Sequence, residues 1–435
     1  MRNILVPATP MKKVLIVSYY WPPSGGSGVQ RWLKFVKYLP AMGIEPHILI
    51  PSGAFYPQID EELFQDVPDN VHLLKVPIWE PYGWYQRVTG VEKKKAIQAS
   101  SIQDGGNQGL AKRLALWVRS NLFIPDARKF WIRPAAKAMV RYVKEQGIET
   151  VISTGPPHTC HLIALRAKRR IPALKWLADF RDPWTNIDFY TDLSLAKWAD
   201  RKHRKLEGQV LRTADKVVGI GYTMGEEFVE MGAHSVEVIT NGFDLDDFPK
   251  QEVTIDEGIV ITHVGVIGKT RNPETLWRAL ALLKEREPAK YKQFKVRLVG
   301  SVGQSVVGSM EEFGIGEILD HVTYVPHTEV FNYLKRSGLL LVVVNNAPNA
   351  KGIVTGKVFE YMASGRPILG LGPTDGDLAK ILEPMASAKM VAHGDVEKLY
   401  AYLKDFEVPL TQVDDAALRY CKDLTQQLVE VIDRL

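Results

Sequence analysis

Residues 12–39 read KKVLIVSYYWPPSGGSGVQRWLKFVKYL, which has the pattern of a strand, a loop and a helix. Residues 14–18 are a short apolar run rich in β-branched side chains, typical of a buried strand. After the glycine-rich loop, apolar side chains recur at three- and four-residue intervals, as in an amphipathic helix: Val29, Trp32, Leu33, Val36 and Leu39. Residues 46–50 form the next apolar run, so this opening predicts a βαβ unit.

The same alternation of strand and helix continues along the chain in two series. In the first series, further strands are expected near residues 71–76, 150–153, 174–179, 216–220 and 236–239. Residues 77–107 interrupt this series and are interpreted as an irregular excursion. The second series follows the turn-rich connector TNGFDLDDFPK (residues 240–250), with strands expected near residues 259–264, 295–299, 321–325, 339–344, 367–371 and 390–392.

This pattern predicts the α/β fold class, with two Rossmann-like, doubly wound domains facing across a cleft. The expected domains are residues 11–245 and residues 246–405, followed by a terminal segment, residues 406–435, that contains a helix over residues 416–432. Ligands of such sheets bind at the carboxyl ends of the strands. The functional residues are therefore expected there.

Composition limits the class of protein. Of the 435 residues, 46% are hydrophobic and 24% are charged, which is typical of globular domains and excludes disorder, collagen-like repeats and coiled-coil rods. The two cysteines, Cys160 and Cys421, are too few for a disulfide framework or a cysteine-based zinc site, and they favour a reducing, cytoplasmic setting. The longest apolar run, residues 339–344, is far shorter than the ~20 residues that cross a bilayer.

Charge is divided unevenly along the chain. Residues 1–245 carry 33 basic and 24 acidic side chains, a balance of +9, whereas the remaining 22 and 26 give residues 246–435 a balance of −4. A basic first half indicates an anionic partner for that half. The alternative is that the asymmetry reflects surface composition alone.

Three features of the first half are candidates for ligand contact. Gly25, Gly26 and Gly28 lie between the first strand and the first helix, where glycine lets the backbone approach a ligand. Their spacing is neither G-x-G-x-x-G nor a Walker A loop, and a tight structural turn is the alternative. His158 and Asp182 each follow the end of a predicted strand. The alternatives for them are a buried or surface histidine and an internal Asp–Arg pair that fixes a loop.

The second half has a basic turn after its first strand. Gly265 and Gly268 flank this turn, and the cations Lys269 and Arg271 suit a diphosphate, because arginine can bind phosphate oxygens bidentately. The alternative is a solvated basic turn. Further on, Glu360 lies in the first turn of a short helix, where a carboxylate can accept hydrogen bonds from ribose hydroxyls. Without that context, Glu360 is a solvated helix residue.

Taken together, these segments resemble a GT-B glycosyltransferase of family 4. The resemblance rests on the glycine loop, DFRDPW (residues 179–184), TNGFD (residues 240–244) and GKVFEYMASGRPILG (residues 356–370), and it covers nearly the whole chain from Met11. It implies that the first domain binds the acceptor and the second binds the sugar nucleotide. It also implies that the terminal helix returns to the first domain.

The resemblance assigns roles to individual positions. Glu360 matches the second glutamate of the E-x7-E motif, which holds the ribose, and the glycine loop matches the one that approaches the donor phosphate. His158 resembles the histidine near the transferred sugar, and Val325 lies where the family contacts the base. The implied catalytic residues are His158, Asp182 and Lys269. The implied donor-binding residues are Gly25, Gly26, Gly28, Gly265, Lys269, Arg271, Val325, Lys357 and Glu360.

One position departs from the family pattern. Gly352 stands where the first glutamate of E-x7-E is expected, with Lys351, Asn345 and Asn346 as candidate substitutes. The scheme needs neither a metal nor a cofactor, since two cations can neutralise the diphosphate. The D-x-D string Asp244–Asp246 lies in the connector and is interpreted as turn and cap chemistry.

Basic and aromatic side chains alternate between residues 112 and 144. Trp117, Leu122, Phe123, Phe130 and Trp131 stand among nine lysines and arginines, a composition that suits the inner face of an anionic membrane carrying a lipid-linked acceptor. Ordinary helices packed on the sheet are the alternative. No nucleic-acid-binding motif is present, so a nucleic-acid partner is not expected.

The function expected from the residues and the resemblance is a retaining hexosyltransferase. It would move a sugar from a nucleotide-sugar donor to a glycan or lipid-linked acceptor during synthesis of a cell-surface polysaccharide. Two alternatives stay open. One is a nucleotide-sugar 2-epimerase, and the other is a catalytically silent protein that binds sugar nucleotides, which the glycine at position 352 makes conceivable.

Overall fold

The computed structural model describes residues 11–80, 110–187, 190, 193–248, 253–323, 325, 327–409 and 421–435. The chain forms two compact units. The first consists of Met1–Thr240 together with Cys421–Leu435, and the second of Asn241–Tyr420. Most of the expected excursion over residues 77–107, and the start of the expected terminal helix, lie outside the described residues.

The first unit is built on a seven-stranded parallel sheet with the order β3-β2-β1-β4-β5-β6-β7. The strands are β1 (Lys12–Val17), β2 (Ile44–Ser52), β3 (His72–Pro77), β4 (Thr150–Gly155), β5 (Lys175–Phe180), β6 (Lys216–Gly219) and β7 (Val236–Val238). The order reverses between β1 and β4. In doubly wound sheets, ligands bind at the carboxyl ends of the strands at such a reversal.

Helices cover both faces of this sheet. They are α1 (Ser27–Tyr38), α3 (Leu110–Leu122), α4 (Ile132–Gln146), α5 (Thr159–Arg170), α6 (Lys197–Thr213), α7 (Tyr222–Glu230) and α15 (Cys421–Asp433). Alternate side chains of β1 enter opposite cores: Leu15 and Val17 pack with α4 and α5, whereas Val14 and Ile16 pack with α1 and α15. Because both faces are covered, the strand is a continuous apolar run.

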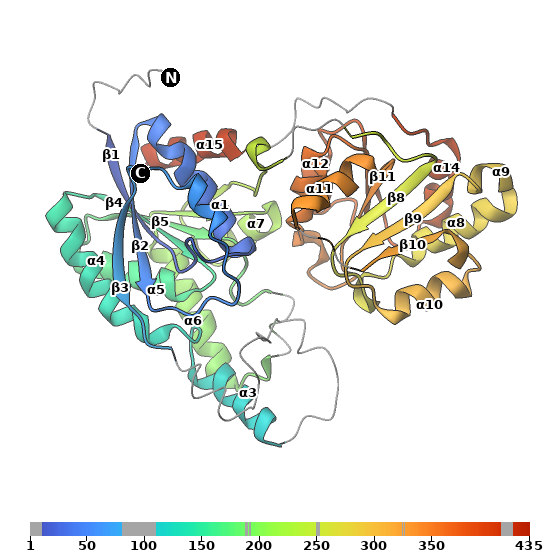
Figure 1. Ribbon diagram of the computed structural model, residues 1–435. Helices are drawn as coiled ribbons and strands as arrows, with labels where there is room; N and C mark the ends of the chain where they lie inside the picture. Colours follow the sequence, from blue (N-terminus) through green and yellow to red (C-terminus); the bar gives the residue numbers. More distant parts are fainter. Residues whose placement is uncertain are drawn as a thin grey trace. The chain divides into compact units, whose positions relative to one another are not determined.

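The last helix completes the core of the first unit. Helix α15 lies beside α1 (Figure 1), where Leu424 and Leu428 join Trp32 and Leu33 in one buried cluster. The Lys12 ammonium at the start of β1 donates to the Ile432 carbonyl at 2.9 Å. The C-terminal segment is therefore an integral part of this unit.

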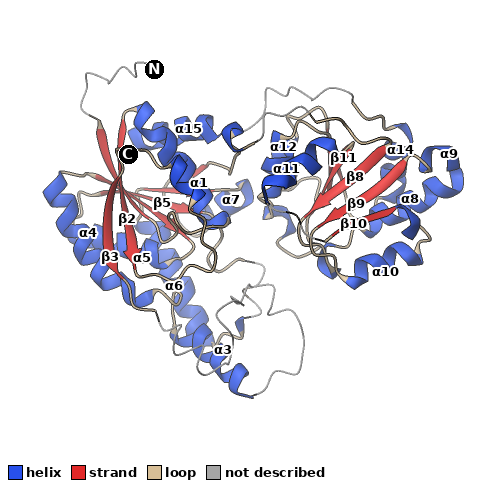
Figure 2. Cartoon of the chain, viewed as in Figure 1, coloured by secondary structure: helices blue, strands red, loops and turns tan. Residues whose placement is uncertain are grey.

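The second unit has a six-stranded parallel sheet with the order β10-β9-β8-β11-β12-β13. Its strands are β8 (Ile259–Val264), β9 (Phe294–Val299), β10 (Leu319–Val322), β11 (Leu339–Val343), β12 (Ile368–Leu371) and β13 (Ala388–Val391). Its helices are α8 (Glu274–Arg286), α9 (Pro288–Tyr291), α10 (Gln304–Glu312), α11 (His327–Arg336), α12 (Lys357–Ala363), α13 (Asp377–Leu382) and α14 (Val396–Asp405). Figure 2 shows these helices around the strands.

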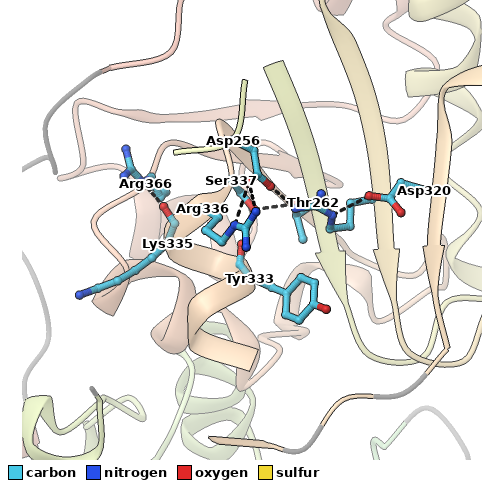
Figure 3. Close-up of polar contacts among 9 residues, drawn as sticks. Asp256, Thr262, Asp320, Tyr333, Lys335, Arg336, Ser337 and Arg366 are labelled. Carbon is cyan, nitrogen blue, oxygen red and sulfur yellow. Dashed lines mark hydrogen bonds and ion pairs between the residues drawn. The ribbon is translucent and has the colours of Figure 1, made fainter. Parts of the chain in front are cut away.

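A polar network holds the segment before β8. Asp256 binds Arg297 on β9 and Arg336 on α11 at 2.5 Å each, and Arg297 also binds Asp320 at 2.8 Å (Figure 3). The Ser337 hydroxyl, just after α11, donates to Thr262 on β8. This network ties α11 to the amino-terminal side of the sheet, at the opposite end from the strand termini where ligands of such folds bind.

The predicted fold class is confirmed: two Rossmann-like domains, each with a parallel sheet flanked by helices. Some element bounds differ. The strand expected over residues 321–325 is β10, Leu319–Val322, so Val325 lies beyond its end. Four of the described helices were not expected from the sequence: α3, α9, α10 and α13. The last three are only 4, 9 and 6 residues long, too short to show a clear apolar period. Among the described residues, the helices are all too short or too polar to cross a membrane.

Candidate active site

Two cations converge at the carboxyl end of β8 in the second unit. Gly265 follows β8 with φ +106°, and a Cβ at this position would overlap the Lys357 ammonium, so only glycine lets the lysine lie against the backbone. Arg271, in the short 3-10 helix Lys269–Arg271, has its guanidinium held by the Asn345 side chain. Because Lys357 and Arg271 line the same cavity, this edge of the sheet is a local centre of positive charge.

The environment of Lys357 is the clearest electrostatic feature of this site. Burial and the neighbouring Arg271 cation lower the pKa of Lys357 to about 8, while Glu360 acts in the opposite direction. With this pKa the lysine is still mostly cationic at neutral pH, although burial and Arg271 make the charged form less stable than it is in water. A bound anion would stabilise the charged form and raise the pKa.

The cavity beneath the two cations is small and largely closed. Its lining residues are His263, Arg271, Leu341, Val342, Val343, Thr355, Lys357 and Tyr361. Its volume of about 10 Å³ leaves room for one water molecule. A diphosphate would therefore lie outside it, against the Arg271 and Lys357 head groups.

Two polar residues in this cavity were not expected from the sequence. His263 donates from Nδ1 to the Leu341 carbonyl at 3.0 Å, and burial together with Lys357 lowers its pKa to about 3, so the imidazole is neutral. The Thr355 hydroxyl is buried and has no hydrogen-bond partner within the described part of the chain. The only sequence signal for His263 was its place near the end of a strand, and none pointed to Thr355.

The other second-unit candidates lie around this centre. Glu360 is half-buried on α12, one helical turn after Lys357. Lys269 is exposed, so the structure brings Arg271 together with Lys357 and leaves Lys269 at the surface. Gly352 ends a short 3-10 helix, and the neighbouring Lys351 ammonium binds Asp375 at 2.5 Å. Val325 is half-buried in the loop after β10.

In the first unit, two histidines lie at the carboxyl end of β4. His158 stacks on Trp184 with ring centroids 4.5 Å apart and parallel planes, and burial lowers its pKa well below the ordinary value. The neutral ring has no hydrogen-bond partner at Nδ1 among the described residues. His158 can therefore act as a neutral hydrogen-bonding group but not as a standing cation.

His161 was missed by the sequence analysis, although it lies one helical turn after His158. It stacks on Phe180 at 4.2 Å, and its Nδ1 lies 2.8 Å from the Ser153 hydroxyl. Burial lowers its pKa to about 3. A Cβ on Gly155 would lie 2.5 Å from its Nε2, so glycine at this position leaves room for the imidazole.

The DFRDPW segment holds the loops of this edge together. Asp179 is buried and accepts hydrogen bonds from Arg31, Trp32 and Thr154, and this ion pair with Arg31 on α1 was not expected from the sequence. Arg181 donates from Nη1 to the Gly28 carbonyl at 2.6 Å and from Nη2 to the Pro156 carbonyl. Asp182 is half-buried and interacts with the Arg181 charge.

The glycine loop has structural constraints of its own. Gly25 donates to the Gln58 carbonyl at 3.0 Å, and Gly26 precedes α1 with φ +87°. A Cβ on Gly28 would lie 3.0 Å from the Tyr20 ring. A tight turn accounts for these glycines, while α1 still presents its amino terminus at the reversal between β1 and β4.

The DxD string has the cap role expected of it. The Asp244 carboxylate accepts a hydrogen bond from the Asp246 backbone at 3.2 Å, which caps the 3-10 helix Leu245–Asp247. This contact satisfies a backbone donor at the start of the helix.

Comparison with known proteins supports the fold. No family model and no curated protein sequence matches the chain. Among solved structures, a glycosyltransferase from Rickettsia africae is 12% identical with a TM-score of 0.59, covering 98% of this chain and 99% of that one. A sucrose-phosphate synthase from Thermosynechococcus elongatus is 14% identical with a TM-score of 0.57, covering 97% and 98%.

A third similar structure belongs to a different enzyme class. A putative UDP-N-acetylglucosamine 2-epimerase from Listeria monocytogenes is 12% identical with a TM-score of 0.51, covering 97% of this chain and 96% of that chain. At these identities the likeness concerns the fold. The chain has two Rossmann-like domains that match those of GT-B glycosyltransferases over nearly their whole length.

Proposed function

We propose that the chain is a glycosyltransferase that moves a sugar from a nucleotide-sugar donor to an acceptor hydroxyl. The observation that carries the proposal is the pairing of Arg271 with Lys357 at the carboxyl end of β8. A nucleoside diphosphate becomes more negative at its leaving oxygen as the glycosidic bond breaks. Two fixed cations stabilise that developing charge more strongly than the ground state, which is the requirement for catalysis.

The remaining candidate residues of each unit are assigned roles in the same reaction. Glu360 holds the ribose hydroxyls, Val325 contacts the base, and Gly265 gives the diphosphate close access to the backbone. The glycine loop of the first unit approaches the donor phosphate. His158 and Asp182 position the transferred sugar and the acceptor, and Lys269 adds positive charge from the surface. In this scheme the cations neutralise the leaving group, so it calls for no metal or cofactor.

The finer assignments follow the sequence resemblance. We infer a family 4 enzyme that transfers a hexose with retention of anomeric configuration to a glycan or lipid-linked acceptor of a cell-surface polysaccharide. The protein would act in the cytoplasm at the inner face of the membrane. The acceptor binds to the basic first unit and the donor to the second.

A donor screen tests the function. Nucleotide sugars are tested for thermal stabilisation of the chain, and the best binder is then assayed for nucleotide release with and without acceptor. Glu360→Ala should weaken donor binding about 10- to 100-fold, because the ribose hydroxyls lose a charged acceptor. Glu312→Ala, at the exposed end of α10, is the matched control and should bind the donor as the unmodified protein does.

The screen also separates the alternatives. The first alternative is a 2-epimerase, for which the sugar would be interconverted while the nucleotide stays attached. Donor binding without turnover on any acceptor would favour the second alternative, a silent binding protein. If no nucleotide sugar stabilises the chain, the glycosyltransferase, the 2-epimerase and the silent binding protein are all contradicted.

We propose further that an exposed aromatic patch on the first unit contacts the membrane. Trp79 and Phe130 are 62% and 43% exposed and pack edge to face at 4.8 Å. The Lys129 ammonium lies 5.0 Å from the Phe130 ring centroid, and Trp117 is 42% exposed on α3. Aromatic rings beside lysine suit the interface of an anionic bilayer. Trp131 is fully buried in the core, so its expected part in this surface was wrong.

Vesicle binding tests the patch. The chain should bind vesicles containing anionic lipid, bind neutral vesicles less, and dissociate as salt rises. The double variant Trp117→Ser/Phe130→Ser should lower the partition coefficient at least about tenfold, since two aromatic anchors are lost. Val229→Ser changes an exposed apolar residue on α7, outside the patch, and serves as the control. Binding that ignores lipid charge and salt would contradict the proposal.

A further inference from the structure

A cluster of two histidines and a glutamate lies away from the candidate active site. Glu45 and His47 are on β2, and His72 is the first residue of β3. One oxygen of Glu45, Oε1, lies 3.0 Å from His47 Nε2 and 3.2 Å from His72 Nε2. The three potential ligand atoms all lie within 4.8 Å of one another. Three side chains thus direct nitrogen and oxygen atoms toward one point.

The spacing and the residue types suit a transition-metal ion. Zinc binds histidine nitrogen and carboxylate oxygen at about 2.0–2.2 Å in tetrahedral geometry, which separates neighbouring ligand atoms by about 3.3 Å. The separations at Glu45 are close to that value. The geometry points to a Zn²⁺ site formed by Glu45, His47 and His72. A water molecule would complete the tetrahedron from the solvent side, since the His72 side chain is 53% exposed.

The fold presents these ligands in a fixed arrangement. In the parallel pairing of β2 with β3, His47 lies directly opposite His72, and Glu45 precedes His47 by two residues on the same face of the strand. The two imidazoles stack with centroids 4.5 Å apart. Since strands set the ligand positions, little chain entropy remains to be lost on metal binding.

A neighbouring helix orients the buried ligand. His47 Nδ1 lies 2.9 Å from the Tyr142 hydroxyl on α4, and His47 is 1% exposed. Metal-bound histidines usually have their second ring nitrogen in a hydrogen bond, which fixes the ring and the tautomer. Tyr142 is thus a positioning residue for the site.

The location indicates what a bound ion would do. β3 is the edge strand of the seven-stranded sheet, and the ligands lie at the amino-terminal ends of β2 and β3. The candidate active site lies at the carboxyl ends. A Zn²⁺ ion here would cross-link the edge strand to its neighbour and is expected to raise stability, whatever the outcome of the proposed function.

Metal binding is measured on the full chain without a histidine tag. After chelation and buffer exchange, Zn²⁺ is titrated against a competing chromophoric chelator, and thermal unfolding is followed with and without the ion. We expect one high-affinity equivalent of Zn²⁺ per chain and a rise in the unfolding temperature. Mg²⁺, which prefers oxygen ligands, should produce neither effect. Co²⁺ should give the visible absorption of a low-coordinate nitrogen and oxygen site.

Variants distinguish a metal site from a hydrogen-bonded cluster. His72→Ala changes an exposed residue and should weaken Zn²⁺ binding at least about 100-fold, and Tyr142→Phe about tenfold. His234→Ala alters an exposed histidine near β7, at the opposite edge of the sheet, and should bind Zn²⁺ normally. Failure of the unmodified chain to bind Zn²⁺, or equal binding by His72→Ala, would overturn the assignment and leave a carboxylate hydrogen-bonded to two imidazoles.

Discussion

Replacing Lys357 with methionine is expected to lower the rate of nucleotide release about 100- to 1,000-fold. The substitution keeps the apolar stem, which lies against Gly265. It removes the ammonium, one of the two positive charges proposed to face the leaving diphosphate, and leaves that of Arg271. The measurement is the initial rate of nucleotide release from the donor identified by the screen. Lys284→Met is the matched control, because Lys284 on α8 is an exposed lysine that binds a carboxylate, Glu317, and has no part in the proposed site.

The same lysine predicts a pH dependence. Its pKa of about 8 in the free protein means that the ammonium is fully charged near pH 6 and largely neutral by pH 9. An anionic donor binds the charged form, so donor affinity should be constant below about pH 7 and fall as the pH rises through 8. Lys357→Arg should flatten the profile, since arginine keeps its charge. An unchanged rate in Lys357→Met, or a flat profile in the unmodified chain, would remove Lys357 from the donor site.

Replacing Asp179 with alanine is expected to destabilise the chain by about 3–5 kcal/mol. Asp179 and Arg31 are both buried, with 1% and 5% of their side chains exposed, and the Trp32 indole also donates to this carboxylate at 2.7 Å. Removing the carboxylate leaves the buried Arg31 cation without its counter-charge, although it still donates to the Thr240 and Ile239 carbonyls. It also leaves the Trp32 indole N–H without its acceptor. Denaturant or calorimetric unfolding at neutral pH measures the loss.

Two further variants test whether charge or shape causes this effect. Asp179→Asn keeps an acceptor but not the charge, so its loss of stability should be intermediate. Asp69→Ala alters an exposed aspartate in the same unit and should change the free energy of unfolding by less than about 0.5 kcal/mol. If Asp179→Ala unfolds like the Asp69 variant, the buried pair contributes nothing net to stability.

The regular elements were predictable because the sequence pattern is local. The run over residues 14–18 and the three- and four-residue spacing of Val29, Trp32 and Leu33 reflect which side chains face the core, and the structure confirms both β1 and α1. The element α10 was missed because Val306 and Met310 are its only buried apolar residues and Gly308 lowers its helix propensity.

The candidate site was harder to predict because its members meet through packing. Arg271 was expected to act with its sequence neighbour Lys269, yet Lys357, 86 positions away, shares its cavity. His161 was not predicted as a site residue because its sequence neighbours in α5 do not indicate that its ring lies at the end of β4. The partners of Asp179 depend on how α1 crosses the sheet. These contacts join residues far apart in the chain, and they arise from the order of the strands and helices in the fold. The spacing of residues along the sequence does not predict them.

Helix α15 has a consequence for how the chain folds during synthesis. Leu424, Leu428 and Ile432 fill the core between α1 and the first sheet, but they leave the ribosome after the whole of the second unit. The core of the first unit therefore stays incomplete, with the apolar face of α1 uncovered, until residues 421–435 have been synthesised. The second unit is contiguous in sequence and can fold before then. Completion of the first unit is thus expected to follow synthesis of residues 421–435, after the second unit has become able to fold.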